Sequence, residues 1–323
     1  MKNKKTSFII TIVLVTLVLV TLFFHLSKID SLLEYRSSSF VKDFMTFYFT
    51  SDLHIDHYCD TSKDIPQFIK RFLPQADILC VAGDTSDNPK LFIDFYREVS
   101  KLYKSVFLVF GNHDLTVQHD NYFLQNPFTE TKKKLKWLKE KLAELQNVTL
   151  LDGTVATCGK IKIGGTMGFN DFSVGSALYP RTKSELKKEW QYWFDNVNWR
   201  YKNNNPDLIL QDELGKLSKI IQEKPDIIMT HFIPTAVGIP EKYKNEISNA
   251  FFYFDANNFL TSMKHNSLWI AGHTHDFSKK IFSHKKGLFT KKVNLLVNPI
   301  GYPMEAKNKY NLKKRCSDFL LNF

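Results

Sequence analysis

Five short polar clusters in the 323-residue sequence contain the side chains that proteins use to bind transition metals. Their members are carboxylates, imidazoles and an amide, and each cluster comes at the end of an apolar run. Mixed imidazole and carboxylate ligands suit Mn, Fe or Zn, whereas Mg and Ca prefer sites made of oxygen alone. In chain order the clusters are Asp52-Leu53-His54, Gly83-Asp84, Gly111-Asn112-His113-Asp114, His231 and Gly272-His273-Thr274-His275. The sequence predicts a metal site if the fold brings these clusters together.

The apolar runs that precede the clusters alternate with helical patterns. The runs predict strands at 44–50, 76–83, 105–111, 225–232 and 267–275, with helices at 65–73, 90–103 and 130–145. Further strands are expected at 148–151 and 292–303 and in the glycine-bounded segments between 154 and 169. Alternation of this kind is typical of parallel βαβ units, in which the carboxyl ends of the strands lie at one ligand-binding edge. We therefore expect an α/β sandwich of mixed sheets flanked by helices, with the five clusters at one edge.

The ordered set D-x-H, G-D, G-N-H-[DE], a single His and G-H-x-H resembles the motifs of the calcineurin-like metallophosphoesterase superfamily. The resemblance extends from about residue 45 to residue 303. It implies a sandwich of two mixed β-sheets and a centre that holds two divalent metal ions. By this resemblance Asp52, His54 and His275 bind the first ion, Asn112, His231 and His273 bind the second, and Asp84 bridges the two.

His113 has a different implied role. In the family the equivalent histidine faces the substrate, stabilises the phosphoryl oxygens or protonates the leaving group, and needs an orienting partner at its other ring nitrogen. Asp87 occupies the position of the carboxylate that pairs with it. The family's usual continuation is Asp-Arg-Gly or Asp-Asn-Gly, whereas this chain has Asp87-Asn88-Pro89, so the loop after Asp87 is open. Asp114 is the alternative partner, or else a helix N-cap.

The resemblance implies binuclear-metal-dependent hydrolysis of a phosphoester by a metal-bridging hydroxide. A membrane-associated or lipid substrate is one expectation. The alternatives are a soluble nucleotide phosphodiesterase, a protein phosphatase, and a catalytically silent binding module. A silent module would be expected to lack a ligand or the substrate-facing histidine, and every such position is filled here.

The N-terminal residues carry a second, independent signal. Residues 8–24 are an apolar run preceded by Lys2, Lys4 and Lys5. A helix needs about 20 apolar residues to cross a bilayer, so 1–27 is expected to be a transmembrane anchor, with a cleaved signal peptide as the alternative. The positive-inside rule favours a single-pass protein of the cell membrane with its catalytic domain outside the cytoplasm. We expect a linker at 28–43, the catalytic domain at 44–305 and a C-terminal tail at 306–323.

Composition adds less. The formal charge of +11 suits an anionic partner or a lysine-rich surface that maintains solubility. Neither zinc-finger spacing nor an RNP-type motif supports nucleic-acid binding. The cysteines are expected to be unpaired thiols, and the remaining histidines to be surface residues. These residues are Cys59, Cys80, Cys158 and Cys316, and His57, His119, His265 and His284.

Three segments allow more than one interpretation. The lysines of 130–145 are expected on a solvated helix face. The aromatic segment 249–259 is either core or a wall of the site, and core is favoured. The tryptophan-rich segment 170–205 is either a substrate-selecting lid or a set of packed surface helices.

Overall fold

The computed structural model describes residues 45–117, 127–239, 241–286, 289–308 and 320–322. The predicted anchor, the linker and most of the predicted tail lie outside these residues, as do His119 and Cys316. Within the described ranges, no helix has both the length and the apolar character needed to span a bilayer.

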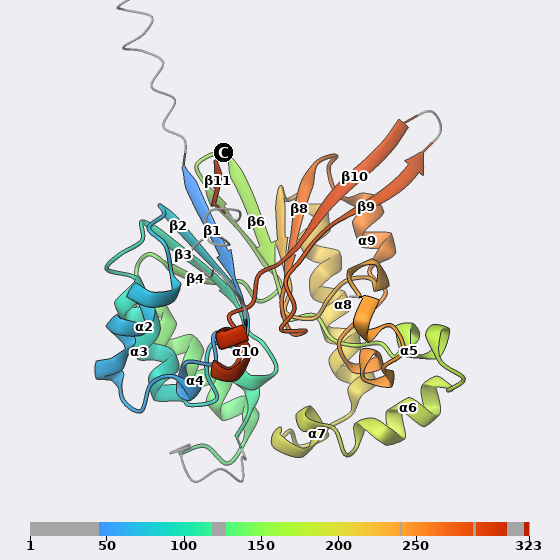
Figure 1. Ribbon diagram of the computed structural model, residues 1–323, viewed down its shortest axis with the longest axis horizontal. Coiled ribbons are helices and arrows are strands. Elements are labelled where there is room, and N and C mark those ends of the chain that lie inside the picture. Colours follow the sequence, from blue (N-terminus) through green and yellow to red (C-terminus); the bar gives the residue numbers. More distant parts are fainter. Residues whose placement is uncertain (1–44, 118–126, 240, 287–288, 309–319, 323) are drawn as a thin grey trace, which may run out of the picture. The chain divides into compact units, whose positions relative to one another are not determined.

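Two mixed β-sheets form the centre of the molecule (Figure 1). The first has the order β11-β1-β2-β3-β4, and the second has the order β5-β6-β7-β8-β10-β9. Strands β1 to β4 are parallel, as are β6, β7, β8 and β10, while β11, β5 and β9 pair antiparallel at the edges. This confirms the predicted α/β fold of two sheets flanked by helices. The strands are β1 Thr46–Thr50, β2 Ile78–Ala82, β3 Ser105–Val109, β4 Val148–Leu150, β5 Thr154–Cys158, β6 Ile161–Gly165, β7 Ile227–Met229, β8 Ser267–Ala271, β9 Ser278–Lys286, β10 Phe289–Val297 and β11 Leu320–Asn322.

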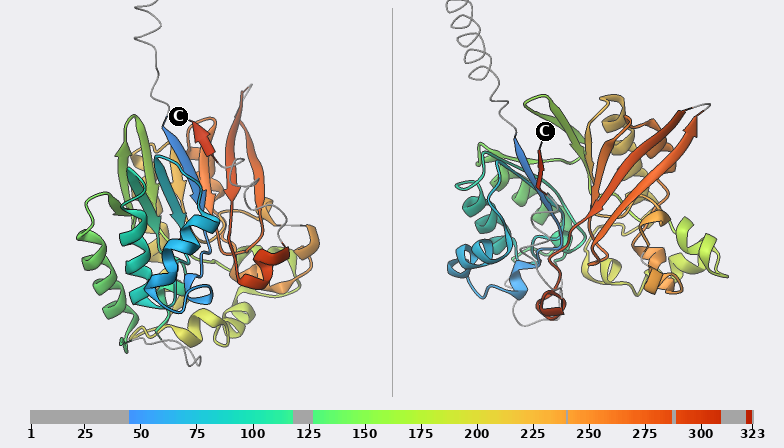
Figure 2. Two further views of the ribbon diagram at one scale, coloured as in Figure 1. Left: turned by 60° about the vertical axis from the view of Figure 1, so that its left-hand side comes forward. Right: turned by 45° about the horizontal axis from the view of Figure 1, so that its top comes forward.

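Helices cover the outer faces of both sheets (Figure 2). Helices α2 Ile65–Phe72, α3 Pro89–Val99 and α4 Thr131–Ala143 lie with the first sheet, and α8 Pro206–Gln222 and α9 Asn257–Ser262 lie with the second. Three short helices occupy the tryptophan-rich segment, α5 Ser173–Leu178, α6 Lys183–Trp190 and α7 Phe194–Asn198. Helix α10, Pro303–Asn308, follows the last strand of the second sheet.

The sequence explains where these elements begin and what they bury. All five residues of β2 are buried, as expected for a central strand covered on both faces. Helix α3 begins after Asn88, whose side chain accepts hydrogen bonds from the backbone N–H groups of Lys90 and Leu91, and Pro89 occupies its first turn. The Asp87-Asn88-Pro89 sequence is therefore a helix start that directly follows Asp87.

The chain after β10 joins the two sheets at the strand ends. Ser51 donates its N–H to the carbonyl of Asn298, and the N–H of Ile300 donates back to Ser51. The side-chain amide of Asn298 also donates to the carbonyl of Phe49 at 2.7 Å. These bonds hold residues 298–301 beside the end of β1 and so bring α10 to the predicted site.

Strand β9 and the buried Lys134 differ from the sequence-based expectations. Strand β9 was not predicted, because an edge strand with few apolar residues lacks the pattern of a buried one. Helix α4 has the expected lysine-rich face, but Lys134 is fully buried, and its ammonium group donates to the carbonyls of Asp87 and Thr116 at 2.8 Å each. The interpretation of all these lysines as solvated was wrong at this residue, since two buried carbonyls need its donors.

Candidate metal centre

The loops at the carboxyl ends of β1, β2, β3, β7 and β8 bring all five polar clusters together. Many of the predicted ligands have left-handed backbone conformations, which non-glycine residues rarely adopt. Such conformations concentrate at functional sites, where the surrounding structure holds them. The φ values are 51° at Asp52, 41° at His54, 55° at Asp84, 72° at His273 and 51° at His275.

Gly111 explains one requirement of these loops. A Cβ atom at this position would collide with the carboxylate and the backbone nitrogen of Asp84. Only glycine therefore allows the loop after β3 to approach the loop after β2 this closely. The contact brings Asn112 and His113 beside Asp84.

The first group of acceptors contains Asp52, His54, Asp84 and His275, whose ligand atoms all lie within 4.8 Å of one another. The Nε2 atoms of His54 and His275 are 3.0 Å apart. Nε2 of His275 lies 3.5 Å from Oδ1 of Asp52, and Nε2 of His54 lies 3.8 Å from Oδ2 of Asp84. This is the set that the family resemblance assigns to the first ion together with the bridging Asp84.

The second group contains Asp84, His231 and His273, with Asn112 beside them. Nε2 of His231 lies 3.2 Å from Oδ2 of Asp84, 2.9 Å from Oδ1 of Asn112 and 3.2 Å from Nδ1 of His273. Asp84 belongs to both groups, as expected of a bridging ligand. The structure thus brings all seven predicted ligands together, and their assignment as ligands stays a prediction.

The hydrogen bonds of His231 indicate what the second group needs. Its Nδ1 is 2.9 Å from the carbonyl of Ala82 and must carry a proton, because a carbonyl only accepts. Nε2 then faces Oδ1 of Asn112 and the carboxylate of Asp84, both of which are acceptors. Burial lowers the pKa of His231, but Asp84 outweighs burial and raises it to about 9, so Nε2 carries a proton that a bound cation would replace. Oδ2 of Asp84 is buried and has no hydrogen-bond partner. Converging acceptors of this kind fit a divalent cation, and N and O donors suit Mn, Fe or Zn.

The electrostatics of three other buried groups agree with that fit. Burial alone would raise the pKa of Asp84, but His231 and His113 outweigh it and hold this pKa well below its ordinary value. Burial, then the charges of His113 and His275, lowers the pKa of His54. Burial and His231 lower the pKa of His273. Asp84 is therefore a carboxylate and these two imidazoles are neutral, which are the protonation states of metal ligands.

His113 lies at the edge of the same centre and faces the adjoining cavity. Its Nδ1 is 2.8 Å from Oδ1 of the buried Asp87, and its ring stacks on Phe194 with centroids 4.2 Å apart. Nε2 lies 3.4 Å from the hydroxyl of Tyr302. Burial lowers the pKa of His113, but Asp87 and Asp84 overcome this effect and raise it to about 10. The pairing with Asp87 is the arrangement that the resemblance implies.

Asp114 is neither the partner of His113 nor a helix N-cap, the two roles expected for it. One carboxylate oxygen accepts from the N–H groups of Asp84 and Gly111, and the other accepts from those of Thr85 and Ser86. Burial and Asp84 raise the pKa of Asp114 to about 7. Asp114 thus ties the loop after β2 to the loop after β3 and does not contact His113 through its side chain.

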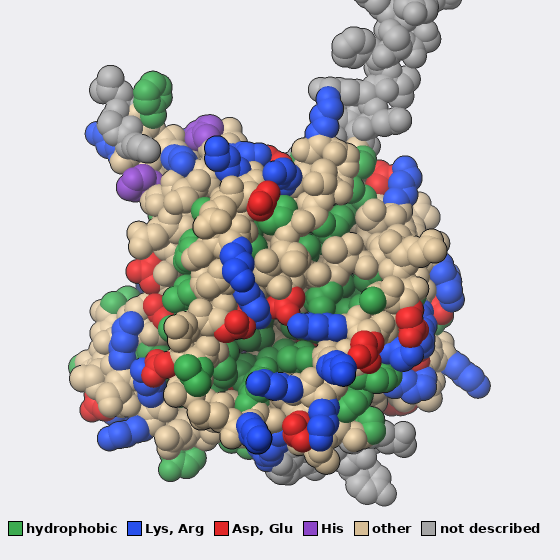
Figure 3. All heavy atoms as spheres, turned by 180° about the vertical axis from the view of Figure 1, so that it is seen from behind, with side chains coloured by type: hydrophobic (Ala, Val, Ile, Leu, Met, Phe, Trp, Pro, Cys, Tyr) green, Lys and Arg blue, Asp and Glu red, His purple; other side chains and the backbone are tan. Residues whose placement is uncertain are grey.

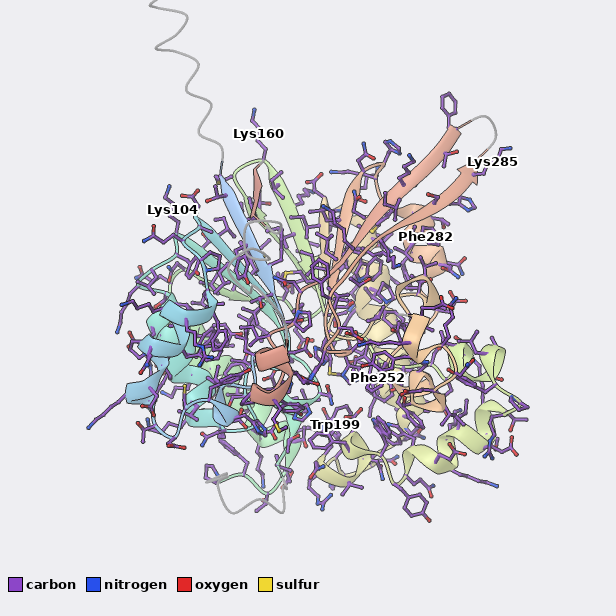
Figure 4. All side chains as sticks on the ribbon, in the orientation of Figure 1. Lys104, Lys160, Trp199, Phe252, Phe282 and Lys285 are labelled. Carbon is purple, nitrogen blue, oxygen red and sulfur yellow. The ribbon has the colours of Figure 1, made fainter. Side chains whose placement is uncertain are left out.

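A cavity of about 450 Å³ opens beside His113, His273 and His275. Phe252 and Tyr253 line it, with the Phe252 ring edge-on to His273 at 4.7 Å, while Phe251 and Phe254 are buried in the core. Segment 249–259 is therefore mainly core, with Phe252 as a wall of the site. Figure 4 labels Phe252 and Trp199 near the carboxyl ends of the strands.

The tryptophan-rich segment is built of packed short helices, and two of its residues also line the cavity, while its role in substrate selection stays a prediction. Trp190 and Trp199 are buried, whereas Trp193 and Phe194 line the cavity. His57, expected as a surface residue, is exposed and also borders the cavity. His265 and His284 are exposed as predicted, and Cys59, Cys80 and Cys158 are free thiols.

Four further residues near the site were not found from the sequence. Asp195 accepts from the Asn112 amide, Glu305 accepts from His275, Tyr302 stacks on His54 at 4.4 Å, and Lys134 holds the carbonyl of Asp87. Burial lowers the pKa of Lys134 to about 8, against the opposing effect of Asp87 and Asp114. None of the four lies in one of the five polar clusters, and Tyr302 and Glu305 come from the segment 297–305 that follows them in the chain.

The chain is similar to a curated relative and to a solved structure. The chain is 24% identical over 282 residues to the uncharacterized protein L509 of Acanthamoeba polyphaga mimivirus, covering 80% of this chain and 92% of that protein. It is similar to the crystal structure of a phosphopantetheinyl hydrolase from Mycobacterium tuberculosis, with a TM-score of 0.63 and 15% identity. That match covers 86% of this chain and 95% of the other, and at this identity it supports the fold alone.

The match to a family model establishes more than these two similarities do. The model of the calcineurin-like phosphoesterases matches residues 45–277, which contain all five polar clusters. The chain therefore belongs to the calcineurin-like phosphoesterase family and is a metal-dependent phosphoester hydrolase.

Proposed function

We propose that the chain uses two divalent ions to hydrolyse a phosphoester whose leaving alcohol is apolar or aromatic and carries no further phosphate. The lining of the cavity is the observation that supports this choice. Its lining includes the aromatic side chains of Trp193, Phe194, Tyr243, Phe252, Tyr253 and Tyr302. Among the described lining residues there is no Lys or Arg, although the chain as a whole has a formal charge of +11.

The charge of the lining separates the candidate substrates. A second or third phosphate of a nucleotide would need cationic partners, which Arg and Lys ordinarily provide. The cavity instead presents Glu246 and Glu305, whose carboxylates would repel such groups. An apolar or aromatic alcohol would pack against Phe252 and Trp193. A lipid phosphoester and a phosphopantetheinyl group, the latter suggested by the solved structure named above, both have mainly uncharged leaving portions.

The residues of the chain would divide the chemistry as follows. Asp52, His54 and His275 would hold one ion, Asn112, His231 and His273 the other, and Asp84 both. When bound, two such ions stabilise the phosphoryl oxygens and lower the pKa of an attacking water. His113 would carry a proton at Nε2, which faces the cavity, and transfer it to the departing oxygen. Asp87 would keep the ring oriented at Nδ1, and the Tyr302 hydroxyl lies 3.4 Å from Nε2 of His113.

Turnover measurements test this proposal. The purified chain, stripped of metal and then supplied with Mn²⁺, should hydrolyse p-nitrophenyl phosphate or its bis ester, and it should prefer detergent-dispersed lipid phosphoesters or phosphopantetheine to ATP and ADP. Phe252→Leu is the matched variant, since it should reduce the preference and leave the metals bound. Preference for nucleotides would contradict the substrate class. Metal-independent turnover that His113→Ala leaves unchanged would contradict the mechanism.

We also propose that residues 1–27 anchor the enzyme in the cell membrane with the catalytic domain outside the cytoplasm. The long apolar run and the preceding lysines support this proposal. Membrane fractionation of the full chain, with a topology reporter fused at the C-terminus, tests it. Recovery of the chain in the soluble fraction with residues 1–27 still attached would refute it.

A further inference from the structure

We propose that Asp195 and Glu305 are positioning residues, each of which fixes the orientation of one ligand in one of the two acceptor groups. Asp195 would act through Asn112 on one ion, and Glu305 through His275 on the other. The inference rests on the proposed binding of two ions. Neither carboxylate belongs to the five polar clusters.

Asn112 has the greater need of such a partner. Its amide has an oxygen that can bind a metal and a nitrogen that cannot, and a half-turn of the side chain exchanges them. Oδ1 of Asp195 accepts a hydrogen bond from Nδ2 of Asn112 at 2.8 Å. Because a carboxylate offers only acceptors, this bond allows one orientation of the amide. In that orientation Oδ1 of Asn112 faces Nε2 of His231 at 2.9 Å.

The surroundings of Asp195 agree with this role. The residue is fully buried in α7, and its Oδ2 has no hydrogen-bond partner. Burying a carboxyl group with one oxygen left unpaired costs stability. The indole N–H of Trp199 donates to the backbone carbonyl of Asn112 at 2.9 Å. The α7 segment therefore holds both the backbone and the side chain of Asn112.

Glu305 fixes the orientation of the His275 imidazole, as Asp195 fixes that of the Asn112 amide. Its Oε2 is 2.8 Å from Nδ1 of His275 and also accepts from the N–H of Tyr302 at 2.8 Å. The carboxylate fixes the proton of His275 on Nδ1, so the lone pair of Nε2 faces Asp52 and His54. Carboxylate partners of metal-binding histidines orient the ring and raise its basicity. By contrast, His231 obtains the same control from the backbone carbonyl of Ala82.

Metal affinity, rather than turnover, is the direct measurement. Equilibrium dialysis of the full-length, metal-stripped chain against Mn²⁺ should give two ions for the wild type. Asp195→Ala should weaken one of them by about 10- to 100-fold, and Glu305→Ala should weaken one by a similar factor. Asp195→Asn and Glu305→Gln retain an acceptor oxygen and should recover most of the affinity. Asp171→Ala is the control, because Asp171 lies in the same segment as Asp195 and bonds only to Ser173 in the described contacts.

Double variants identify which ion each carboxylate serves. The effect of Asp195→Ala should disappear when Asn112 is already Ala and should persist when His275 is already Ala. Glu305→Ala should show the reverse pattern, since coupled residues are non-additive and independent ones are additive. Wild-type affinity in Asp195→Ala, or additivity with Asn112→Ala, would overturn the inference for Asp195. A wild-type chain that binds no second ion would instead overturn the proposed function, and the inference with it.

Discussion

Two hollows of similar size differ in whether their charged groups are paired with groups of opposite charge. The cavity beside His113 has a volume of about 450 Å³, and a groove between α4 and α8 has about 490 Å³. Figure 3 shows the back of the molecule, where Lys, Arg, Asp and Glu side chains surround a hydrophobic hollow. In the groove, Lys216 pairs with Asp152, Asp212 and Glu213 at 2.7–2.9 Å. Glu213 also accepts from Thr166 and from the N–H of Gly168.

The difference lies in which groups are left unsatisfied. Each carboxylate of the groove pairs with Lys216, so these charges are balanced without a bound ion. In the metal centre, imidazole nitrogens and carboxylate oxygens converge on one another, and the buried Oδ2 of Asp84 has no hydrogen bond that satisfies it, although Nε2 of His231 lies 3.2 Å away. Such an arrangement is costly without a cation. Size and apolar lining do not separate the two hollows, whereas the balance of donors and acceptors does.

Replacing Asp84 should have the largest effect. Asp84→Asn preserves the shape of the side chain but removes the charge shared by both acceptor groups, so we expect kcat to fall by at least about 1,000-fold and metal binding to be lost. Metal content by mass spectrometry and turnover with p-nitrophenyl phosphate measure this. Asp152→Asn in the groove is the matched control and should retain both. Full activity of Asp84→Asn would remove the basis of the comparison.

His113 should come next, because it acts on the leaving group and is not expected to bind metal. His113→Asn should lower kcat by about 100- to 1,000-fold while metal content stays unchanged. The deficit should shrink for substrates with good leaving groups, such as p-nitrophenol, since these need less proton transfer. An equal deficit for poor and good leaving groups would show that His113 does not protonate the departing oxygen.

Lys216 tests the other half of the comparison. Lys216→Met should leave the buried carboxylate of Glu213 without its cation and lower the free energy of unfolding by about 2 kcal/mol. Urea denaturation measures this loss. Because the groove is structural in this account, kcat and metal content should equal those of the wild type. A large loss of turnover in the folded variant would mean that the groove participates in function.

Phe252 should show the smallest effect. Phe252→Leu keeps an apolar side chain but removes the ring that forms a wall of the cavity, so KM for a phosphoester with a bulky apolar alcohol should rise by about 3- to 10-fold. The KM for a small phosphoester such as methyl phosphate should change by less than twofold or so by the same reasoning. Parallel increases in both values would argue against a role in substrate selection.

The ligand clusters could be predicted because they obey a local rule. Each follows an apolar strand, and parallel strands place their carboxyl ends at one edge, so Asp52, Asp84 and His231 could be brought together from the sequence alone. The fold class follows from the same alternation of strands and helices. Both predictions therefore rest on patterns that are visible within short stretches of the sequence.

The supporting residues could not be predicted in this way. Asp195 and Glu305 reach the site through the path of the chain in three dimensions, and neither stands at a predicted strand end. Lys134 occupies a helix whose other lysines are mostly exposed, and only the packing of α4 on the loop after β2 shows that it is buried. Strand β9 is an edge strand with few apolar residues and so lacks a clear pattern.

Anomalous diffraction tests the central claim most directly. Crystals of the chain saturated with Mn²⁺ or Co²⁺, measured at the absorption edge of the metal, should show two peaks about 3.5–4 Å apart on either side of Oδ2 of Asp84. One peak should lie beside His54 and His275, and the other beside Asn112 and His231. A single peak, or none within coordinating distance of Asp84 at saturating metal, would contradict the account.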